Sequence, residues 1–382
     1  MLKNQIAKRE RAAWALGALF VACVIGACGL ARAQQTPGER AAQGADANAA
    51  PQALAALRSP DATTRAAAAY RLSKEPAEAR AVLSVLVELL ADAALVNPVV
   101  YRKMEPWQAQ MDLTVGHEAA GALVAAGSAA FEPLVGALER GSVEARRNAV
   151  WALGALRDRR AVEPVIQSLT DADAHVRDQA AWALGALHDR RAVPALSAAM
   201  RDPSKEVREQ AAWALGALRE PGAVDALMGA LKDADAGVRQ QAAWALGAVG
   251  DRRAIEALTA TLTDDDAHAQ AQAAWALGAL RDERATEALC AALKSNAAET
   301  RTQAAWALGA IRDPRAVLPL TAALADGHAH VRAQAAWALG AIGDARAADA
   351  LRGARNDGDA HVRQQVEWAL SVLSGRLSAK QP

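Results

Sequence analysis

Apolar positions recur along most of this chain with a helical period, and the whole pattern repeats every 31 residues. In the block that starts at Ala172, the apolar residues Val176, Ala180, Leu184 and Leu187 follow one another at spacings of four, four and three. This spacing places them on one face of an amphipathic helix. Each block therefore predicts a first helix with a buried apolar face.

A second, shorter helix is predicted in each block. In the same block it starts near Arg191 and buries Val193, Leu196 and Met200. Asp173 stands where a side chain can cap the first helix. The same slot holds Asp235, Asp266 and Asp359 in other blocks. The second helices carry proline in their first turn, where it is tolerated, at Pro164, Pro194 and Pro319.

Tryptophan marks the repeat most clearly. Eight of the ten Trp residues follow one another at intervals of 31 positions, and the six blocks from Trp182 to Trp337 carry the identical string AAWALGA. Self-similarity at such a period is typical of a solenoid, and no stretch alternates as a strand would. We therefore predict an all-α fold. The regular positions are Trp151, Trp182, Trp213, Trp244, Trp275, Trp306, Trp337 and Trp368.

The pattern around AAWALGA resembles the HEAT-like repeats of the phycobilin-lyase type. The resemblance covers residues 141–373 strongly and 51–140 weakly. It implies a right-handed α-solenoid of stacked antiparallel helix pairs. The predicted organisation is a signal peptide at 1–33, a flexible linker at 34–50, divergent repeats at 51–140 with an insert at 91–112, seven regular repeats at 141–357, and a C-terminal capping repeat with a tail at 358–382.

The N-terminus has the parts of a secretory signal. A basic segment precedes an apolar stretch at 12–30, and Ala31-Arg32-Ala33 then fits cleavage before Gln34. Two alternatives stay open: a lipoprotein signal cleaved before Cys28, and an uncleaved anchor. In each case the positive charges ahead of the apolar stretch predict export of the remaining chain. The basic residues are Lys3, Lys8, Arg9 and Arg11.

Composition narrows the class of partner. The formal net charge is zero and no long basic run is present, which argues against a nucleic-acid partner. Ten residues are Trp, against two Phe and two Tyr, which indicates a specific, repeated role for Trp. Cys290 is the one cysteine that follows the signal, so no internal disulfide is expected in the exported chain. Its mid-helix position favours a small buried apolar residue.

Two charged slots repeat with the same period. One Arg slot lies five residues before the Trp position, and one Asp slot lies seven residues after it. A charged ligand groove is one interpretation, but the charges cancel within each block, which favours a structural ladder of Asp–Arg hydrogen bonds between neighbouring repeats. Glu220 and Gln270 interrupt the slots and predict weaker rungs. The slots hold Arg65, Arg146, Arg177, Arg208, Arg239, Arg301, Arg332 and Arg363, and Asp158, Asp189, Asp251, Asp282, Asp313 and Asp344.

A helical wheel places Trp182 away from the apolar stripe of its helix, on a face shared with His175, Asp178, Gln179 and Ala186. In the resembled family this side lines the concave surface. The row is either a seal over the seam between repeats or a recognition surface, and both roles are compatible. The candidate partner-binding residues are Trp151, Trp182, Trp213, Trp244, Trp275, Trp306 and Trp337, with Gln179, Gln210 and Gln241.

The sequence offers few candidate catalytic or metal-binding residues. His330 and His361 are the one adjacent pair among the histidines seven residues before Trp, and solvated side chains are favoured over a metal site. His117-Glu118 is similar to one of the His-Glu pairs of deoxyhypusine hydroxylase, a HEAT-like di-iron family that needs four. We therefore expect no catalytic residues, no metal and no cofactor. The insert, with Tyr101, Met104, Trp107 and Met111, is a secondary partner-site candidate.

These observations predict a non-catalytic protein-interaction scaffold in a bacterial cell envelope. A protein or peptide partner would bind the concave face, and membrane contact would come through the signal segment or a lipid on Cys28. The alternative is a HEAT-like enzyme related to deoxyhypusine hydroxylase or phycobilin lyase, which the single His-Glu pair disfavours.

Overall fold

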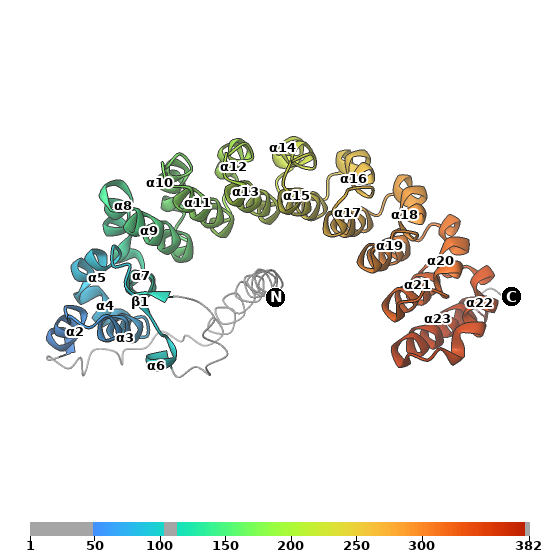
Figure 1. Cartoon of the computed structure of the whole chain (residues 1–382), viewed down its shortest axis with the longest axis horizontal. Coiled ribbons are helices and arrows are strands. Elements are labelled where there is room, and N and C mark those ends of the chain that lie inside the picture. Colours follow the sequence, from blue (N-terminus) through green and yellow to red (C-terminus); the bar gives the residue numbers. More distant parts are fainter. Residues whose placement is uncertain (1–48, 103–112, 379–382) are drawn as a thin grey trace, which may run out of the picture. The chain divides into compact units, whose positions relative to one another are not determined.

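The computed structural model describes residues 49–102 and 113–378, which form a right-handed α-solenoid of stacked helices (Figure 1). The all-α prediction is confirmed. The predicted signal peptide, including Cys28, lies outside the described residues, as do Met104, Trp107 and Met111 of the insert.

Each regular repeat contains a long A helix, a 3₁₀ turn and a short B helix. Successive A helices pack directly on one another and form the inner layer, with the B helices outside them (Figure 1). The A helices are α9 (Val143–Leu156), α11 (Ala174–Leu187), α13 (Lys205–Leu218), α15 (Ala236–Val249), α17 (Ala267–Leu280), α19 (Ala298–Ile311), α21 (Ala329–Ile342) and α23 (Ala360–Ser378). The turns between A and B helices are η3 (Arg159–Ala161), η4 (Arg190–Ala192), η5 (Pro221–Ala223), η6 (Arg252–Ala254), η7 (Glu283–Ala285), η8 (Pro314–Ala316) and η9 (Ala345–Ala347), and a further 3₁₀ turn, η10 (Ala354–Asn356), follows the last B helix. The B helices are α10 (Val162–Ser168), α12 (Val193–Ala199), α14 (Val224–Ala230), α16 (Ile255–Thr261), α18 (Thr286–Ala292), α20 (Val317–Ala323) and α22 (Ala348–Gly353).

The divergent N-terminal part is also built from packed helices. Its insert adds two strands, β1 (Leu95–Val96) and β2 (Leu113–Thr114), which pair antiparallel. The sequence predicts no strands, and this prediction is wrong for the insert. A strand of two residues is too short to show the alternating pattern by which strands are recognised. The helices are α2 (Ala49–Leu57), α3 (Ala62–Leu72), α4 (Pro76–Ala81), α5 (Leu83–Leu89), α6 (Val99–Arg102), α7 (Val115–Ala126), η2 (Gly127–Ala130) and α8 (Phe131–Arg140).

One segment of this part, Val115–Arg140, is apolar and long enough to cross a membrane by composition alone. The turn η2 interrupts it, and α7 packs against α3, α5 and α9. Its apolar side chains, such as Val115, Leu123 and Leu134, are buried inside the stack. The segment therefore has the packing of a core helix pair.

Five of the A helices begin at a capping side chain, whereas α13, α19 and α21 make no such bond. The predicted Asp caps are confirmed. A carboxylate oxygen of Asp173 accepts hydrogen bonds from the amides of His175 at 2.9 Å and Val176 at 3.2 Å. Asp235, Asp266 and Asp359 make the same bonds in their repeats. These caps satisfy amides that have no partner within the helix.

Most of the A helices end at a residue with left-handed backbone. Glycine occupies this position at Gly250 and Gly343, where the conformation carries no strain. Arg or His occupies it in the other repeats, at a cost of about 1–2 kcal/mol for a residue with a Cβ. A positive charge at a helix C-terminus offsets about 0.3–1 kcal/mol of that cost. These residues are Arg157, His188, Arg219, Arg281 and Arg312, with φ from 51° to 65°.

Glycine also allows neighbouring A helices to approach closely. A Cβ placed on Gly216 would lie 2.7 Å from Cζ3 of Trp244 and 2.8 Å from the Cα of Ala245. The same arrangement recurs at each seam from Gly154 to Gly340. The string AAWALGA thus supplies buried Ala and Leu, a glycine gap and the indole that covers it.

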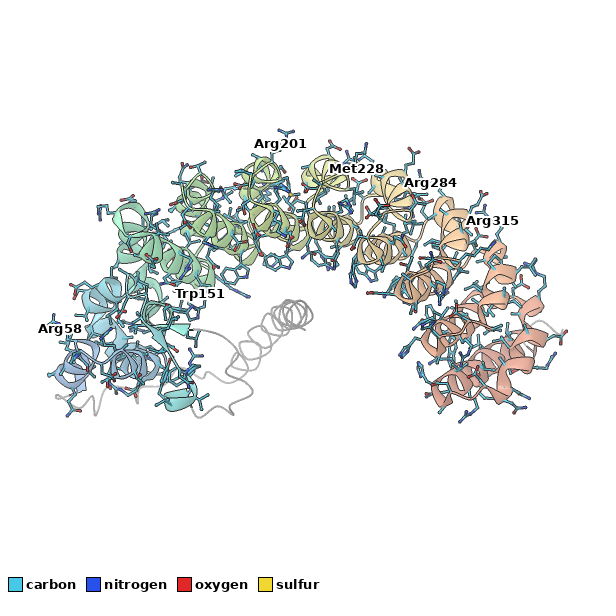
Figure 2. All side chains as sticks on the ribbon, in the orientation of Figure 1. Arg58, Trp151, Arg201, Met228, Arg284 and Arg315 are labelled. Carbon is cyan, nitrogen blue, oxygen red and sulfur yellow. The ribbon has the colours of Figure 1, made fainter. Side chains whose placement is uncertain are left out.

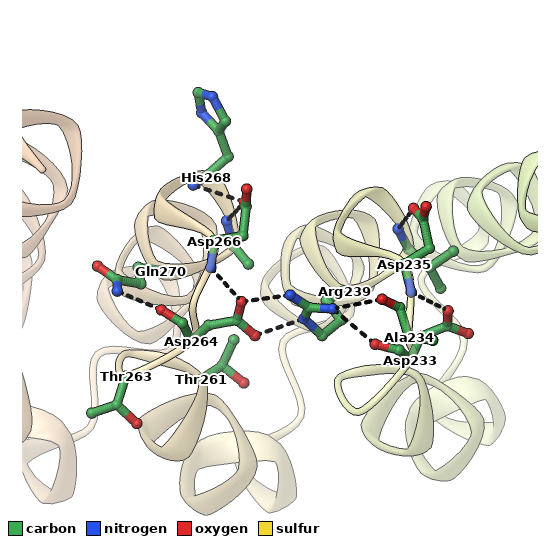
Figure 3. A network of polar contacts seen from close by, with 12 residues as sticks. Asp233, Ala234, Asp235, Arg239, Thr261, Thr263, Asp264, Asp266, His268 and Gln270 are labelled. Carbon is green, nitrogen blue, oxygen red and sulfur yellow. Dashed lines mark hydrogen bonds and ion pairs between the residues drawn. The ribbon is translucent and has the colours of Figure 1, made fainter.

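One ladder of ion pairs joins the loops that precede successive A helices (Figure 3). Arg239 donates from Nε to Asp264 at 2.7 Å and from Nη2 to the same carboxylate at 2.8 Å. Its Nη1 donates to the carbonyl oxygen of Asp233 at 2.9 Å. Two-pronged bonds of this kind fix orientation as well as distance. The equivalent pairs are Arg65–Asp92, Arg146–Asp171, Arg177–Asp202, Arg208–Asp233, Arg301–Asp326 and Arg332–Asp357.

A second ladder lies at the other end of the A helices. Asp189 accepts from the amide of Arg191 at 3.1 Å and pairs with its guanidinium at 3.0 Å. Arg191 also donates to the carbonyl oxygen of Arg159 in the preceding repeat at 3.0 Å. The predicted structural ladder is confirmed, but pairing of the two predicted slots is wrong. Twelve residues separate them along the A helix, which is about 18 Å.

The first ladder has one neutral rung. Gln270 replaces the Arg, and its Nε2 donates to the carbonyl oxygen of Asp264 at 2.6 Å. Its Oε1 accepts from the hydroxyls of Ser295 at 3.0 Å and Thr300 at 3.1 Å. Ser295 stands in the Asp position, so both partners have changed together. The rung predicted to be weaker at Gln270 is therefore formed by neutral side chains. In the second ladder, Glu220 occupies the Asp slot and makes no capping hydrogen bond.

We expect Gly216→Ala to lower the free energy of unfolding by about 1–3 kcal/mol, because the added methyl group overpacks the seam. Gly229→Ala, in the interior of α14, is the matched control, since no atom lies within 4 Å of its added Cβ. It should be neutral or stabilising by up to about 1 kcal/mol. Chemical unfolding of both variants tests this. Equal effects at the two sites would contradict the close approach.

We expect Gln270→Arg and Ser295→Asp to be coupled. Each single change places one unpaired charge in the seam, whereas the double variant rebuilds the ion pair found in neighbouring rungs. The double-mutant cycle should show a favourable coupling free energy of about 1–3 kcal/mol. Chemical unfolding of the four proteins measures it. Additive effects would show that the two positions are independent.

Candidate protein-binding face

The predicted Trp residues lie on the exposed side of the A-helix layer. Figure 2 shows Trp151 directed toward the inner side of the stack. The indoles from Trp151 to Trp337 are half-buried, and Trp368 is 40% exposed. We call the surface formed by these indoles and the Gln side chains three residues before them the Trp/Gln face.

Each indole rests on the preceding repeat. Cζ3 of Trp213 covers Gly185, and Cζ3 of Trp244 covers Gly216. At the first regular repeat, the ring of Trp151 instead packs on the ring of His117, with centroids 4.8 Å apart. The sealing role considered from the sequence is therefore present, and it leaves part of each ring open to solvent.

The polar groups of the Trp/Gln face have no partners within residues 49–102 and 113–378. Within the described residues, neither the indole N–H groups nor the side-chain amides of Gln179, Gln210 and Gln241 make a hydrogen bond. The Gln side chains are half-buried. The buried polar atoms that lack a partner include none of these groups, so they reach solvent. Each repeat thus presents donors and an acceptor beside an aromatic ring.

Two carboxylates share this side of the A helices, four residues before Trp182 and Trp213. Burial raises the pKa of Asp178 to about 6, with His175 opposing the shift and Glu206 reinforcing it. Asp178 makes no hydrogen bond among the described residues. Asp178 is a desolvated carboxylate that makes no ion pair within the described residues.

Glu209 is the second of these carboxylates. Burial and a hydrogen bond with Asp235 raise its pKa to about 7, and Lys205 opposes the shift. Lys205 lies 3.3 Å from Asp235. The helical pattern of the sequence places Asp178 on the face of Trp182, but nothing in that pattern indicates the burial of either carboxylate, because this burial depends on the neighbouring helix.

The His117-Glu118 pair is used in packing. Glu118 is 2% exposed and accepts a hydrogen bond from Tyr101 at 2.8 Å. Arg102 pairs with the same carboxylate at 2.5 Å and lies over the ring of Tyr70. Burial lowers the pKa of His117 and raises that of Tyr101. The insert therefore anchors itself on α7 through Glu118.

The cavities and the cysteine of the described residues provide no further candidate for a catalytic or metal site. One cavity of about 530 Å³ lies between α16 and α18, beside the neutral rung at Gln270. Another of about 440 Å³ is lined by charged side chains that include Arg159 and Arg191. Among the described residues, no three His, Cys, Asp or Glu side chains are placed to hold a metal. Burial raises the pKa of Cys290 to about 11, so it is a protonated thiol at neutral pH.

Sequence comparison identifies the repeat. The sequence profile of HEAT repeats matches six overlapping stretches, at residues 131–204, 162–247, 195–278, 229–303, 256–329 and 286–371. No curated protein matches the chain.

Three solved structures are similar. YibA of Escherichia coli is 19% identical over 69% of this chain and 98% of its own, with a TM-score of 0.51. The CpcE–CpcF complex of phycocyanin lyase from Nostoc is 25% identical over 63% of this chain and 94% of its own, with a TM-score of 0.38. Human deoxyhypusine hydroxylase is 25% identical over 64% of this chain and 96% of its own, with a TM-score of 0.31.

The two raised pKa values predict a pH dependence of stability. Between about pH 4 and about pH 7 these two sites bind more protons in the folded chain than in the unfolded chain, so their contribution to the free energy of unfolding falls as pH rises through this window. We expect the Asp178→Asn, Glu209→Gln variant to be more stable than the wild type at pH 8, by on the order of 1–3 kcal/mol. Near pH 4 the two proteins should converge.

Denaturant unfolding across this range checks the effect. Gln240→Ala changes the same slot of the next repeat and should leave the pH dependence intact. Parallel curves for the double variant and the wild type would contradict burial of the two carboxylates.

Proposed function

Because the chain belongs to the HEAT-repeat family, we propose that it is a non-catalytic scaffold that binds a protein partner on the Trp/Gln face. The observation that carries this proposal is the unsatisfied polarity of that face. Every regular repeat from α11 to α21 presents a half-buried indole and a Gln amide that have no hydrogen-bond partner in the part of the chain that the structure describes.

Sealing the seams does not account for these groups. An aliphatic side chain would cover the glycine gap without placing an N–H group at the surface, and Ala in the Gln position would favour the helix more. Tyr, Trp and Arg dominate the energetics of protein interfaces, because an indole buries a large area and keeps a polar edge. The periodic pairing of indole and amide is therefore suited to recognition.

The stack supports binding through rigidity. Two ladders of hydrogen bonds and the close A-helix seams hold successive repeats in one arrangement. A surface that is already ordered loses little conformational entropy on binding. The partner then meets indoles at fixed intervals along the stack.

The chemistry of the face favours binding over catalysis. Glu118 of the His117-Glu118 pair is committed to Tyr101 and Arg102. Similar solved structures include a lyase and a hydroxylase. The alternative enzymatic function would require reactive groups on the Trp/Gln face, and that face offers amides, indoles and two carboxylates.

The location belongs to the same proposal. The basic and apolar segments that precede Gln34 support export, and the chain would act in the periplasm or on the cell envelope. Cleavage before Gln34 would release it, and lipidation at Cys28 would tether it. The membrane would be contacted through this segment alone.

Capture from bacterial envelope extract tests the function. The exported chain, starting at Gln34, should retain a partner that the Trp213→Gln, Trp244→Gln, Trp275→Gln variant loses. Because these indoles also cover the seams, a second variant, Gln179→Leu, Gln210→Leu, Gln241→Leu, removes amides that make no bond within the chain. We expect both variants to lose the partner, with circular dichroism confirming that they remain folded.

Leu318→Gln provides the control. Leu318 is 73% exposed on α20 of the outer layer, so its replacement removes apolar surface from the other side of the stack. This variant should capture as the wild type does. Equal capture by the wild type and the Gln179→Leu, Gln210→Leu, Gln241→Leu variant would overturn binding on the Trp/Gln face.

A further inference from the structure

We infer that the occupant of the Trp/Gln face is a proline-rich segment in polyproline II conformation, with a basic side chain beside Asp178. This inference rests on the proposed function and specifies its partner. It follows from three features of the face: the interval between repeats, the kind of polar group presented, and a carboxylate, that of Asp178, which makes no ion pair or hydrogen bond within the described residues.

The interval comes from helix packing. Packed helices lie about 8–10 Å apart, so one indole and one amide recur at about that spacing along the A layer. A polyproline II helix has three residues per turn and rises about 3.1 Å per residue, so it repeats the same face every 9.3 Å or so. A β-strand repeats a face every two residues, or about 6.8 Å, and would drift out of register within a few repeats.

The polar groups suit a chain with an open backbone. Polyproline II makes no internal hydrogen bonds, which leaves every carbonyl oxygen free to accept. The indole N–H of Trp213 and the amide N–H of Gln210 are donors without partners, and each repeat supplies the same pair. A folded domain has already satisfied most of its backbone carbonyls. A regular row of such donors is therefore matched to an extended main chain.

The surface beside the indoles has room for that chain. Ala186, Ala217 and Ala248 occupy the position four residues after each Trp, on the same side of the helix, and are half-buried. Their small side chains keep the surface low next to the rings. Proline rings then pack against indoles and alanine methyl groups, which is the way aromatic-lined grooves hold proline-rich peptides.

The charge specifies one residue of the partner. Asp178 is a half-buried carboxylate with no hydrogen bond, and the groups near it are His175 on its own helix and Glu206 on α13. Glu209, in the next repeat, already has Asp235 and Lys205 as neighbours. A Lys or Arg side chain of the partner at the position of Asp178 would supply the missing countercharge, since an opposite charge favours the ionised carboxylate.

Fluorescence anisotropy with synthetic peptides tests the inference on the exported chain. The probes are labelled peptides of two to six Gln-Pro-Pro turns, with Lys replacing Gln in one central turn. We expect affinity to rise with each added turn, and a Gln-Gly-Gly peptide of equal length to bind about tenfold more weakly, because it must lose more conformational entropy on binding. Length-independent binding, or equal binding of the glycine peptide, would overturn the conformation proposed.

Variants of the chain test the contacts. Gln179→Leu, Gln210→Leu, Gln241→Leu should weaken every proline peptide by about tenfold or more, since three hydrogen bonds are lost. Gln167→Leu, on the B helix α10, is the control and should have no effect. Unchanged binding by the triple variant would exclude main-chain recognition by the amides.

The charge has its own test. The wild type should prefer the Lys peptide to the all-Gln peptide, and this preference should decline as pH falls below about 6, where Asp178 takes up a proton. Asp178→Asn should abolish the preference and its pH dependence. If the peptides fail but a folded protein is captured through the Trp/Gln face, the scaffold function stands and the proline-rich partner is excluded.

Discussion

The close approach of neighbouring A helices is the constraint on which the rest of this structure depends. Gly216 and its equivalents leave no space for a methyl group, because the next indole and the next backbone already occupy it. Buried Ala and Leu fill the remaining seam. Since every seam uses the same residues, each repeat meets the next in the same way, and the indoles fall into a row. The Trp/Gln face is thus a consequence of how the repeats pack.

Most of the ion pairs lie at the two ends of the A helices. One ladder joins Arg239 to Asp264 and its equivalents, and the other joins Arg191 to Asp189 and to the preceding turn. Because most ions are paired there, the Trp/Gln face between them carries mainly neutral donors. Its charged side chains in the slot four residues before Trp are Arg147, Asp178 and Glu209. Recognition on that face therefore relies mainly on hydrogen bonds and ring contacts.

The ends of the stack show how the pattern is adapted. At the first regular repeat, the ring of Trp151 packs on the ring of His117, and the insert secures α7 through Glu118. At the last described repeat, Glu367 and Ser371 replace Ala and Gly and are exposed, as a polar capping repeat requires. Trp368 is more exposed than the other regular indoles, and within the described residues no later A helix packs beside it.

The 31-residue period, the capping Asp residues and the apolar stripes determined the fold class, the helix pairs and the side on which Trp lies, because these depend on local geometry within one repeat. The contacts between neighbouring repeats were decided by the tertiary structure alone. Arg239 pairs with Asp264 and not with Asp251, although Asp251 is nearer in sequence, because Arg239 and Asp251 lie at opposite ends of an A helix. The tertiary structure also buried Asp178 and Glu209, because their solvent is displaced by side chains from adjacent elements.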